Sequence, residues 1–259
     1  MPYLCLCCEN ESDDFLIRCP WCGAAMPVNE TRERDGGGAA PLPLPEVTAS
    51  SVPRMMSHVR AIDGLLGGGI IRGSSLLLAG APGAGKSTLL IQLLDLFAEK
   101  SLYVSGEESV QQLKLRADRL RISSGAISVV FETDVNSVIS HVRKAPPRLL
   151  VIDSIQTVYS DRSGSMPGTP AQVRLCTHQL RRLAQEKEMV LLIVGQVTKA
   201  MQAAGPKLLE HAVDCVLSLL VDAEDPAART LAVVKNRFGP AGCALSLHIA
   251  GGGFMLRKG

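Results

Sequence analysis

The chain has 259 residues, of which 46% are hydrophobic and 20% are charged. This length allows one sizeable α/β domain with a small appendage and excludes a second full-size domain, and the composition gives no reason to expect global disorder. With 27 basic and 25 acidic residues the formal net charge is +2. Charge alone therefore neither requires nor excludes a nucleic-acid partner, and any such contact would have to be local.

The first chemical signal is a cluster of cysteines at the N-terminus, where Cys5 and Cys8 form one C-x-x-C pair and Cys19 and Cys22 form a second. Two such pairs joined by a short hairpin can place four thiolates around a tetrahedral metal, and Zn²⁺ suits such ligands best. We therefore predict a four-cysteine zinc finger over residues 1–27. Its metal is expected to be structural, because four thiolates leave no position for a catalytic water.

Two alternatives stay open for this cluster. The thiols could be reactive or fortuitous rather than ligands, and Cys7 stands beside Cys8, where it could compete for the metal. The lone Cys176, Cys215 and Cys243 lie in apolar or helical surroundings and are interpreted as structural cysteines. We find no leader segment and no apolar run near the ~20 residues that span a bilayer, so we expect a reducing, cytoplasmic location without membrane contact.

Residues 28–54 separate the cysteine cluster from the rest of the chain. This segment reads VNETRERDGGGAAPLPLPEVTASSVPR, and its glycines, alternating prolines and small polar residues indicate a flexible linker. Over residues 55–259, short apolar runs alternate with amphipathic stretches, which predicts βαβ units and a largely parallel sheet. We find no internal repeat.

Several of the predicted strands are continuous runs of Leu, Ile and Val, as strands covered on both faces require. The strands are predicted at Ser75–Ala79, Leu102–Val104, Ile127–Phe131, Leu149–Ile152, Val190–Val194, Val213–Leu220 and Leu231–Val234. Two stretches, Ser87–Glu99 and Ala171–Glu188, are predicted to be helices. The ending CALSLHIAGGGFMLRKG alternates in part around a triple glycine and predicts a terminal hairpin.

The strongest motif is GAPGAGKS at residues 80–87, which matches G-x-x-x-x-G-K-[ST] between the predicted strand SLLLA and a predicted helix. Its backbone N–H groups can surround phosphate oxygens, Lys86 can reach the β- and γ-phosphates, and the Ser87 hydroxyl can coordinate Mg²⁺. The alternative is a glycine-rich turn that binds no nucleotide. The residues expected to bind ATP are Gly80, Ala81, Pro82, Gly83, Ala84, Gly85, Lys86, Ser87 and Thr88.

Acidic residues at two further strand ends are candidates for catalysis. The apolar run LLVID ends in Asp153, from which a carboxylate can hold Mg²⁺ beside the phosphates together with Ser87. Glu107 and Glu108 follow another strand, and one of them is expected to orient or deprotonate the attacking water. The residues alone do not decide between these two glutamates, or between a base and two solvated loop acids.

The chain resembles the RadA family of bacterial DNA-repair ATPases, also called Sms, within the RecA-like superfamily. The resemblance rests on the zinc-finger cysteines and on LGGGIIRGSSLLLAGAPGAGKSTLLIQ, LYVSGEESVQQLKLRADRL, LLVIDSIQTVYSD, QVRLCTHQL, VTKAMQAAGPKLLEHAVD and KNRFG at residues 235–239. The last of these is the family's own signature. The resemblance covers nearly the whole chain except the linker and the last dozen or so residues.

The resemblance implies an α/β RecA-like P-loop fold, a homo-oligomeric ring that we expect to be hexameric, and single-stranded or branched DNA as the track in recombinational repair. It makes Glu107 the catalytic base, and it places Lys235 and Arg237 at the nucleotide of a neighbouring subunit. Gln196, where family members often have His, is expected to sense the γ-phosphate. We also expect DNA contacts from Thr198–Lys207 and Tyr159–Thr169, and a recombinase or helicase partner for the zinc finger.

The family normally continues into a Lon-protease-like domain, which these 259 residues do not include, so we expect a short form. The leading hypothesis is a DNA-dependent ATPase, with helicase or branch-migration activity as its mechanical output. A KaiC-like ATP-switched assembly or signalling protein that binds no DNA is the alternative. A replicative helicase core of the DnaB type is a third reading, but it would not explain the four cysteines.

Overall fold

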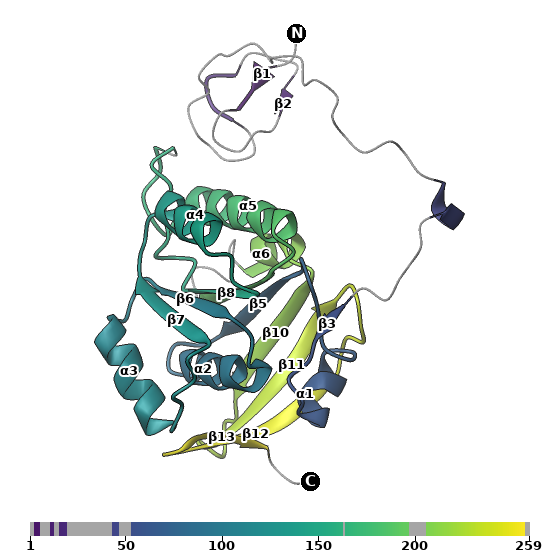
Figure 1. The fold of residues 1–259 in the computed structure, drawn as a ribbon, viewed down its shortest axis with the longest axis vertical. Coiled ribbons are helices and arrows are strands. Elements are labelled where there is room, and N and C mark those ends of the chain that lie inside the picture. Colours follow the sequence, from purple (N-terminus) through teal and green to yellow (C-terminus); the bar gives the residue numbers. More distant parts are fainter. Residues whose placement is uncertain are drawn as a thin grey trace.

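A nine-stranded sheet forms the centre of the protein (Figure 1). The computed structural model describes residues 3–5, 11–12, 16–19, 43–46, 53–162, 164–196 and 206–256. The sheet order is β13-β12-β11-β10-β5-β9-β8-β6-β7. The strands from β10 to β7 in this order are parallel, and β11, β12 and β13 continue the sheet as an antiparallel wing. Their bounds are β5 Ser75–Gly80, β6 Ser101–Ser105, β7 Ile127–Phe131, β8 Leu149–Asp153, β9 Val190–Gln196, β10 Cys215–Val221, β11 Ala228–Asn236, β12 Ala244–Ala250 and β13 Gly253–Leu256.

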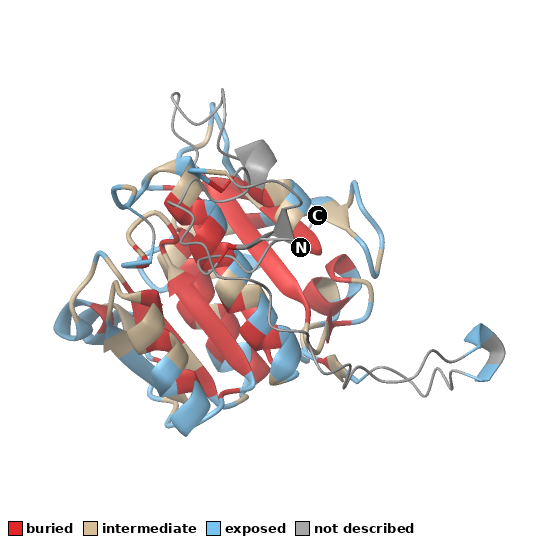
Figure 2. Ribbon diagram, turned by 90° about the horizontal axis from the view of Figure 1, so that it is seen from above, coloured by how far each residue is buried: buried red, intermediate tan, exposed pale blue. Residues whose placement is uncertain are grey.

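Helices cover both faces of the sheet (Figure 1). The bounds are α1 Arg60–Leu65, α2 Lys86–Phe97, α3 Val110–Arg119, α4 Val135–Lys144, α5 Pro170–Glu186 and α6 Pro206–Ala212. One apolar core joins one face of the sheet to α1, α2 and α3, and a second joins the other face to α4, α5 and α6. The central strands are therefore buried on both sides (Figure 2), which explains their continuous apolar sequences.

Smaller elements lie before the central sheet in the sequence. β3 (Arg54–Met55) pairs with β4 (Ile70–Ile71), and a short 3₁₀ helix covers Leu44–Glu46. Near the N-terminus, β1 (Tyr3–Leu4) pairs antiparallel with β2 (Glu11–Ser12). Most of the predicted linker at residues 28–54 lies outside the described residues, and the boundaries at residues 27 and 54 stay predictions.

All seven predicted strands are confirmed, and so is the terminal hairpin. Four strands are one or two residues longer than predicted, β7 has the predicted bounds, β10 is shifted toward the C-terminus and one residue shorter, and β11 is five residues longer. The two predicted helices end earlier than expected, at Phe97 and Glu186. Ala98 takes a left-handed conformation (φ 51°) whose N–H bonds to the Leu94 carbonyl, so the chain leaves the helix in time to enter β6 at Ser101. Within the described ranges, no helix is long and apolar enough to cross a membrane.

Candidate active site

The predicted nucleotide residues gather at the carboxyl ends of four adjacent strands. In the order β5-β9-β8-β6, the phosphate loop follows β5, Gln196 ends β9, Asp153 ends β8, and Glu107 follows β6. Gly80 and Gln196 are partners in the sheet register, and so are Ser105 and Asp153. Residues spread over more than a hundred positions of sequence therefore meet at one edge of the sheet, where α/β proteins bind their ligands.

The loop at residues 80–85 has the backbone that phosphate binding requires. Gly83 and Gly85 have φ values of 76° and 102°, which favour glycine. Gly85 is the N-cap of α2 and carries no side chain to satisfy the first backbone N–H groups of the helix. Those donors, at the positive end of the helix dipole, remain for an anion.

Lys86 spans this loop, since its Nζ donates to the carbonyl oxygens of Gly80 and Ala81 at 2.9 Å each. Burial lowers the pKa of the Lys86 ammonium, while the charges of Asp153 and Glu107 raise it. The Lys86 side chain is buried, and its ammonium is close enough to both predicted catalytic carboxylates to be affected by their charges. A phosphate bound in the loop would therefore lie beside a positive charge.

A hydroxyl and a carboxylate suited to Mg²⁺ lie side by side at the start of α2. Ser87 Oγ donates to Asp153 Oδ2 at 2.6 Å, and Tyr103 OH donates to the same carboxylate oxygen. Burial, and secondly the Asp153 carboxylate, raise the pKa of Tyr103 well above its ordinary value, which keeps the phenol protonated. The oxygens of Ser87 and Asp153 are suitable ligands for a magnesium ion that also contacts the phosphates.

The two candidate glutamates have different partners. Glu107 Oε1 accepts a hydrogen bond from Ser154 Oγ at 2.7 Å, beside the Asp153 strand end. Glu108 forms an ion pair with Arg116 of α3, and Arg116 Nη1 also donates to Thr88 Oγ1 at 3.1 Å. Glu108 thus belongs to a network that fastens α3 to α2, whereas Glu107 lies at the edge where the phosphates are expected.

The basic pair Lys235 and Arg237 lies near the amino-terminal ends of the parallel strands, opposite the phosphate loop. Arg237 Nη1 donates to Asp214 Oδ1 at 3.1 Å, and Asp214 Oδ2 accepts from the N–H and Oγ of Ser75 at 2.9 and 2.7 Å. Ser75 begins β5 and the phosphate loop starts at its end, Gly80. At ~3.3 Å per residue, the pair is about 17 Å from its own phosphate loop.

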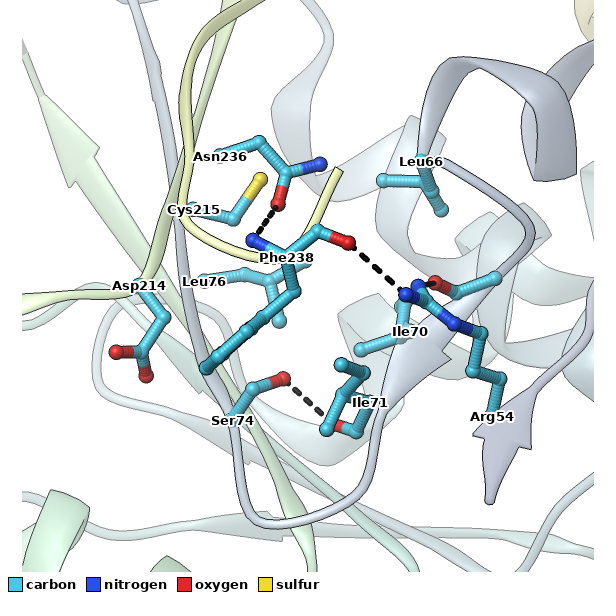
Figure 3. Close-up of a pocket in the computed structure, with 11 residues that line it drawn as sticks. Arg54, Leu66, Ile70, Ile71, Ser74, Leu76, Asp214, Cys215, Asn236 and Phe238 are labelled. Carbon is cyan, nitrogen blue, oxygen red and sulfur yellow. Dashed lines mark hydrogen bonds between the residues drawn. The ribbon is translucent and has the colours of Figure 1, made fainter. Parts of the chain in front are cut away.

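The turn that carries the pair is fastened to its own protomer. Lys235 Nζ donates to the carbonyls of Glu210 and Val213 at 2.6 and 2.7 Å, which caps the end of α6. Figure 3 shows that Arg54 Nη2 donates to the Phe238 carbonyl on the other side, at 2.9 Å. The turn is therefore held in place while Arg237 stays about half exposed.

Sequence reasoning missed two polar residues near the phosphate loop. Arg229, at the start of β11, is 8% exposed, and its Nε donates to the Ala84 carbonyl at 3.0 Å. Tyr103 is fully buried and bonds to Asp153. Each lies in a strand that carries other polar residues as well, SLYVS and ARTLAVVKN, so no signal in the sequence marked these two side chains as part of the site.

The zinc ligands are described only in part. Cys5 and Cys19 are buried, whereas Cys7, Cys8 and Cys22 lie outside the described residues. Among the residues that the structure does describe, no group of three or more His, Cys, Asp or Glu could hold a metal. The four-cysteine site stays a prediction.

The remaining cysteines largely agree with a structural role. Cys176 and Cys215 are buried, and burial, with a contribution from Asp214, raises the pKa of the Cys215 thiol to about 12. A thiol with such a pKa is unreactive near neutral pH. Cys243 differs from the expectation because it is only partly buried.

The two predicted DNA-contacting loops are described unequally. Tyr159–Thr169 has no helix or long strand among its described residues, and Met166 is 75% exposed. The stretch 197–205 lies outside the described residues, as do the side chains of Gln196 and Lys207.

Together, the parallel sheet, the glycine loop before α2 and the Asp153 strand end define a RecA-like P-loop ATPase fold, a class that uses ATP with Mg²⁺. The chain belongs to the AAA domain family, whose model matches residues 39–202.

The curated relatives carry a DNA-repair name. One from Bacillus subtilis, named DNA repair protein RadA, is 40% identical over 253 residues, which cover 92% of this chain and 55% of the relative. The chain thus spans about half the length of the curated relatives it matches.

Solved structures share the fold at lower identity. The RadB recombinase is 22% identical with a TM-score of 0.61, and the match covers 79% of this chain and all of that structure. A KaiC-like protein from Pyrococcus horikoshii is 20% identical with a TM-score of 0.65, covering 80% of this chain and all of its own. At these identities the likeness concerns the fold alone.

Proposed function

We propose that the chain is a DNA-dependent ATPase of recombinational DNA repair, which couples ATP hydrolysis to movement on, or remodelling of, single-stranded or branched DNA. The observation that carries the proposal is the position of Lys235 and Arg237 at a fixed turn, a strand length from their own phosphate loop, with the Arg237 side chain about half exposed. A cation in this position can serve a nucleotide only in a neighbouring protomer, as a ring motor requires. The relatives named DNA repair protein RadA support DNA as the track.

Within one protomer, the residues at the carboxyl ends of the strands have separate roles in ATP hydrolysis. The loop N–H groups and Lys86 bind the phosphates, and Ser87 and Asp153 would hold Mg²⁺, which neutralises charge on the transferred phosphoryl group. Glu107 takes a proton from the water whose oxygen bonds to the γ-phosphorus as the bond to the β-phosphate oxygen breaks. Gln196, beside Gly80 in the register, senses the γ-phosphate.

Between protomers, Lys235 and Arg237 contact the neighbour's γ-phosphate in a homo-oligomeric ring, proposed to be a hexamer. The segments Tyr159–Thr169 and Thr198–Lys207 contact DNA. The N-terminal cysteines Cys5, Cys8, Cys19 and Cys22 hold Zn²⁺ in a module that binds a recombinase or helicase partner.

The decisive measurement is the ATPase rate with and without single-stranded DNA at low salt, where phosphate contacts are strongest. The proposal expects stimulation by DNA that declines as salt rises, and Lys86→Ala should remove both the basal and the stimulated rate. If the chain hydrolyses ATP but DNA neither binds nor stimulates it, the KaiC-like assembly or signalling function replaces the repair function. The fold is common to both functions and does not separate them.

A further inference from the structure

The least expected polar group in the core is the phenol of Tyr103. This residue lies in the middle of β6, is 0% exposed, and packs in the apolar core that joins the sheet to α2 and α3. A buried strand position of this kind normally takes a hydrocarbon side chain, because a buried hydroxyl without a hydrogen-bond partner is unfavourable. The hydroxyl does have a partner, the carboxylate of Asp153.

The partner is the group proposed to hold Mg²⁺. Asp153 ends β8, the neighbour of β6, and its Oδ2 accepts from Tyr103 OH on one side and from Ser87 Oγ on the other. Across the described residues, both hydrogen bonds reach Oδ2, so Oδ1 is the oxygen left for other contacts. A carboxylate held by two donors on one oxygen has a single orientation before any metal arrives.

We propose that Tyr103 is a positioning residue for the metal site: its hydroxyl fixes the Asp153 carboxylate in the orientation that binds the nucleotide's divalent cation. The proposal rests on the assignment of Asp153 as a metal ligand. Tyr103 itself touches neither the nucleotide nor the metal. Hydrogen-bond partners of metal ligands commonly contribute 10–100-fold to metal affinity, so a comparable effect is expected here.

The ring of Tyr103 has a separate packing role, which the test must leave intact. It lines an apolar cavity of about 340 Å³ together with residues of α2, α3 and β7. Tyr103→Phe keeps this wall and removes one oxygen, so the fold should be retained, whereas Tyr103→Ala would confound the two roles. Ser101→Ala is the matched control, since Ser101 is a buried residue at the start of the same strand and its Oγ donates to the Glu99 carbonyl at 2.7 Å.

The test measures ADP affinity in EDTA and Mn²⁺ affinity of the ADP complex, the latter by electron paramagnetic resonance. Tyr103→Phe should leave the ADP affinity unchanged and weaken the Mn²⁺ affinity by roughly 10-fold or more, while Ser101→Ala changes neither. Wild-type Mn²⁺ affinity in Tyr103→Phe, or an equal loss in both measurements, would overturn the positioning role. Asp153→Ala tests the underlying assignment separately: if it binds Mn²⁺ normally, Asp153 is not the ligand and the proposal falls with it.

Discussion

At the scale of single residues, the two adjacent glutamates show how hydrogen bonding separates roles that sequence cannot. Glu108 is engaged by Arg116, which also reaches Thr88 on the phosphate-loop helix, and Glu107 is held by Ser154 next to the proposed metal ligand. Glu108 is thus occupied by the contact between helices α2 and α3, whereas Glu107 lies at the strand ends where the phosphates are expected. The contacts therefore favour Glu107 as the base.

Replacing Glu107 by Gln should retain ATP binding and lower the turnover number by at least about 100-fold, because only activation of water is lost. Glu108→Gln should keep most of the turnover and lower stability slightly, since its ion pair is partly exposed. ATP affinity and steady-state hydrolysis of both variants provide the comparison. A near wild-type rate for Glu107→Gln with a dead Glu108→Gln would reverse the assignment.

The environment of Asp214 leads to a second prediction, which concerns the pH dependence of stability. Burial alone would raise its pKa, but the hydrogen bonds from Ser75 and the charges of Arg181 and Arg237 lower it below the ordinary value. A carboxyl whose folded-state pKa is depressed stabilises the protein above its unfolded pKa, near 3.9, and loses this contribution as the pH falls through the folded value.

Between about pH 6 and about pH 3, the wild type should therefore lose more free energy of unfolding than Asp214→Asn does. Urea unfolding at the two pH values measures this difference. Asp225→Asn serves as the control, because its carboxylate lies in the β10–β11 loop and bonds only to nearby backbone. Parallel pH profiles for wild type and Asp214→Asn would contradict the prediction.

At the scale of elements, sequence predicted the sheet well and the helices poorly. Continuous apolar runs mark strands buried on both faces, and all seven were found. α3 and α4 were missed because they are short and largely polar, with few buried residues each. α3 nevertheless carries a signal, since Ser109 and Gln112 form a capping box whose S-x-x-Q spacing can be read in the sequence.

The candidate site was predicted where a motif fixes the spacing, and missed where only the fold brings residues together. The loop at residues 80–87 and Asp153 could be read from strand ends. Tyr103 and Arg229 could not, because their partners lie 50 and 145 positions away in the sequence.

The β12–β13 hairpin supports the phosphate loop from outside. A Cβ on Gly85 would lie 2.8 Å from the Phe254 ring, and Gln92 of α2 bonds both the N–H and the carbonyl of Phe254. Phe254→Ala should weaken ATP binding and lower stability by about 2 kcal/mol, less than a fully buried ring because this one is partly exposed. Met255→Ala, on the exposed side of the same strand, is the control for calorimetric titration with ATP. If Phe254→Ala binds ATP as tightly as Met255→Ala does, the hairpin does not support the phosphate loop.

The N-terminal cysteines are predicted to form a module separate from the ATPase domain. Joint replacement of Cys19 and Cys22 by Ser should release zinc and unfold residues 1–27, while ATP affinity stays unchanged because the predicted linker separates the two parts. Metal content and nucleotide titration of the reduced protein test this, with Cys243→Ser as the control. A reduced wild type without bound zinc would reject the site.

At the scale of the whole molecule, the role proposed for the basic pair predicts that ATP hydrolysis requires an assembly of subunits. Lys86→Ala subunits cannot use their own nucleotide but still offer Arg237, and Arg237→Ala subunits have sound pockets. If the cation acts between subunits, mixtures should exceed the sum of the separate ATPase rates, since an arginine in trans contributes ~10³-fold or more. Co-assembly is verified by differently tagged subunits. Strictly additive rates in demonstrably mixed rings would eliminate the interface role.

The strand β11 connects the phosphate loop with the turn that carries Lys235 and Arg237. β11 begins at Arg229's contact with the Ala84 carbonyl and ends at the lysine that caps α6. Its middle pairs with β10 on one side and with β12 on the other, so backbone hydrogen bonds hold it along both edges. In the proposed ring, a shift of the phosphate loop on nucleotide binding would be transmitted along β11 toward the neighbouring subunit. Coupling of this kind would make the ATP sites of neighbouring subunits hydrolyse in sequence rather than independently.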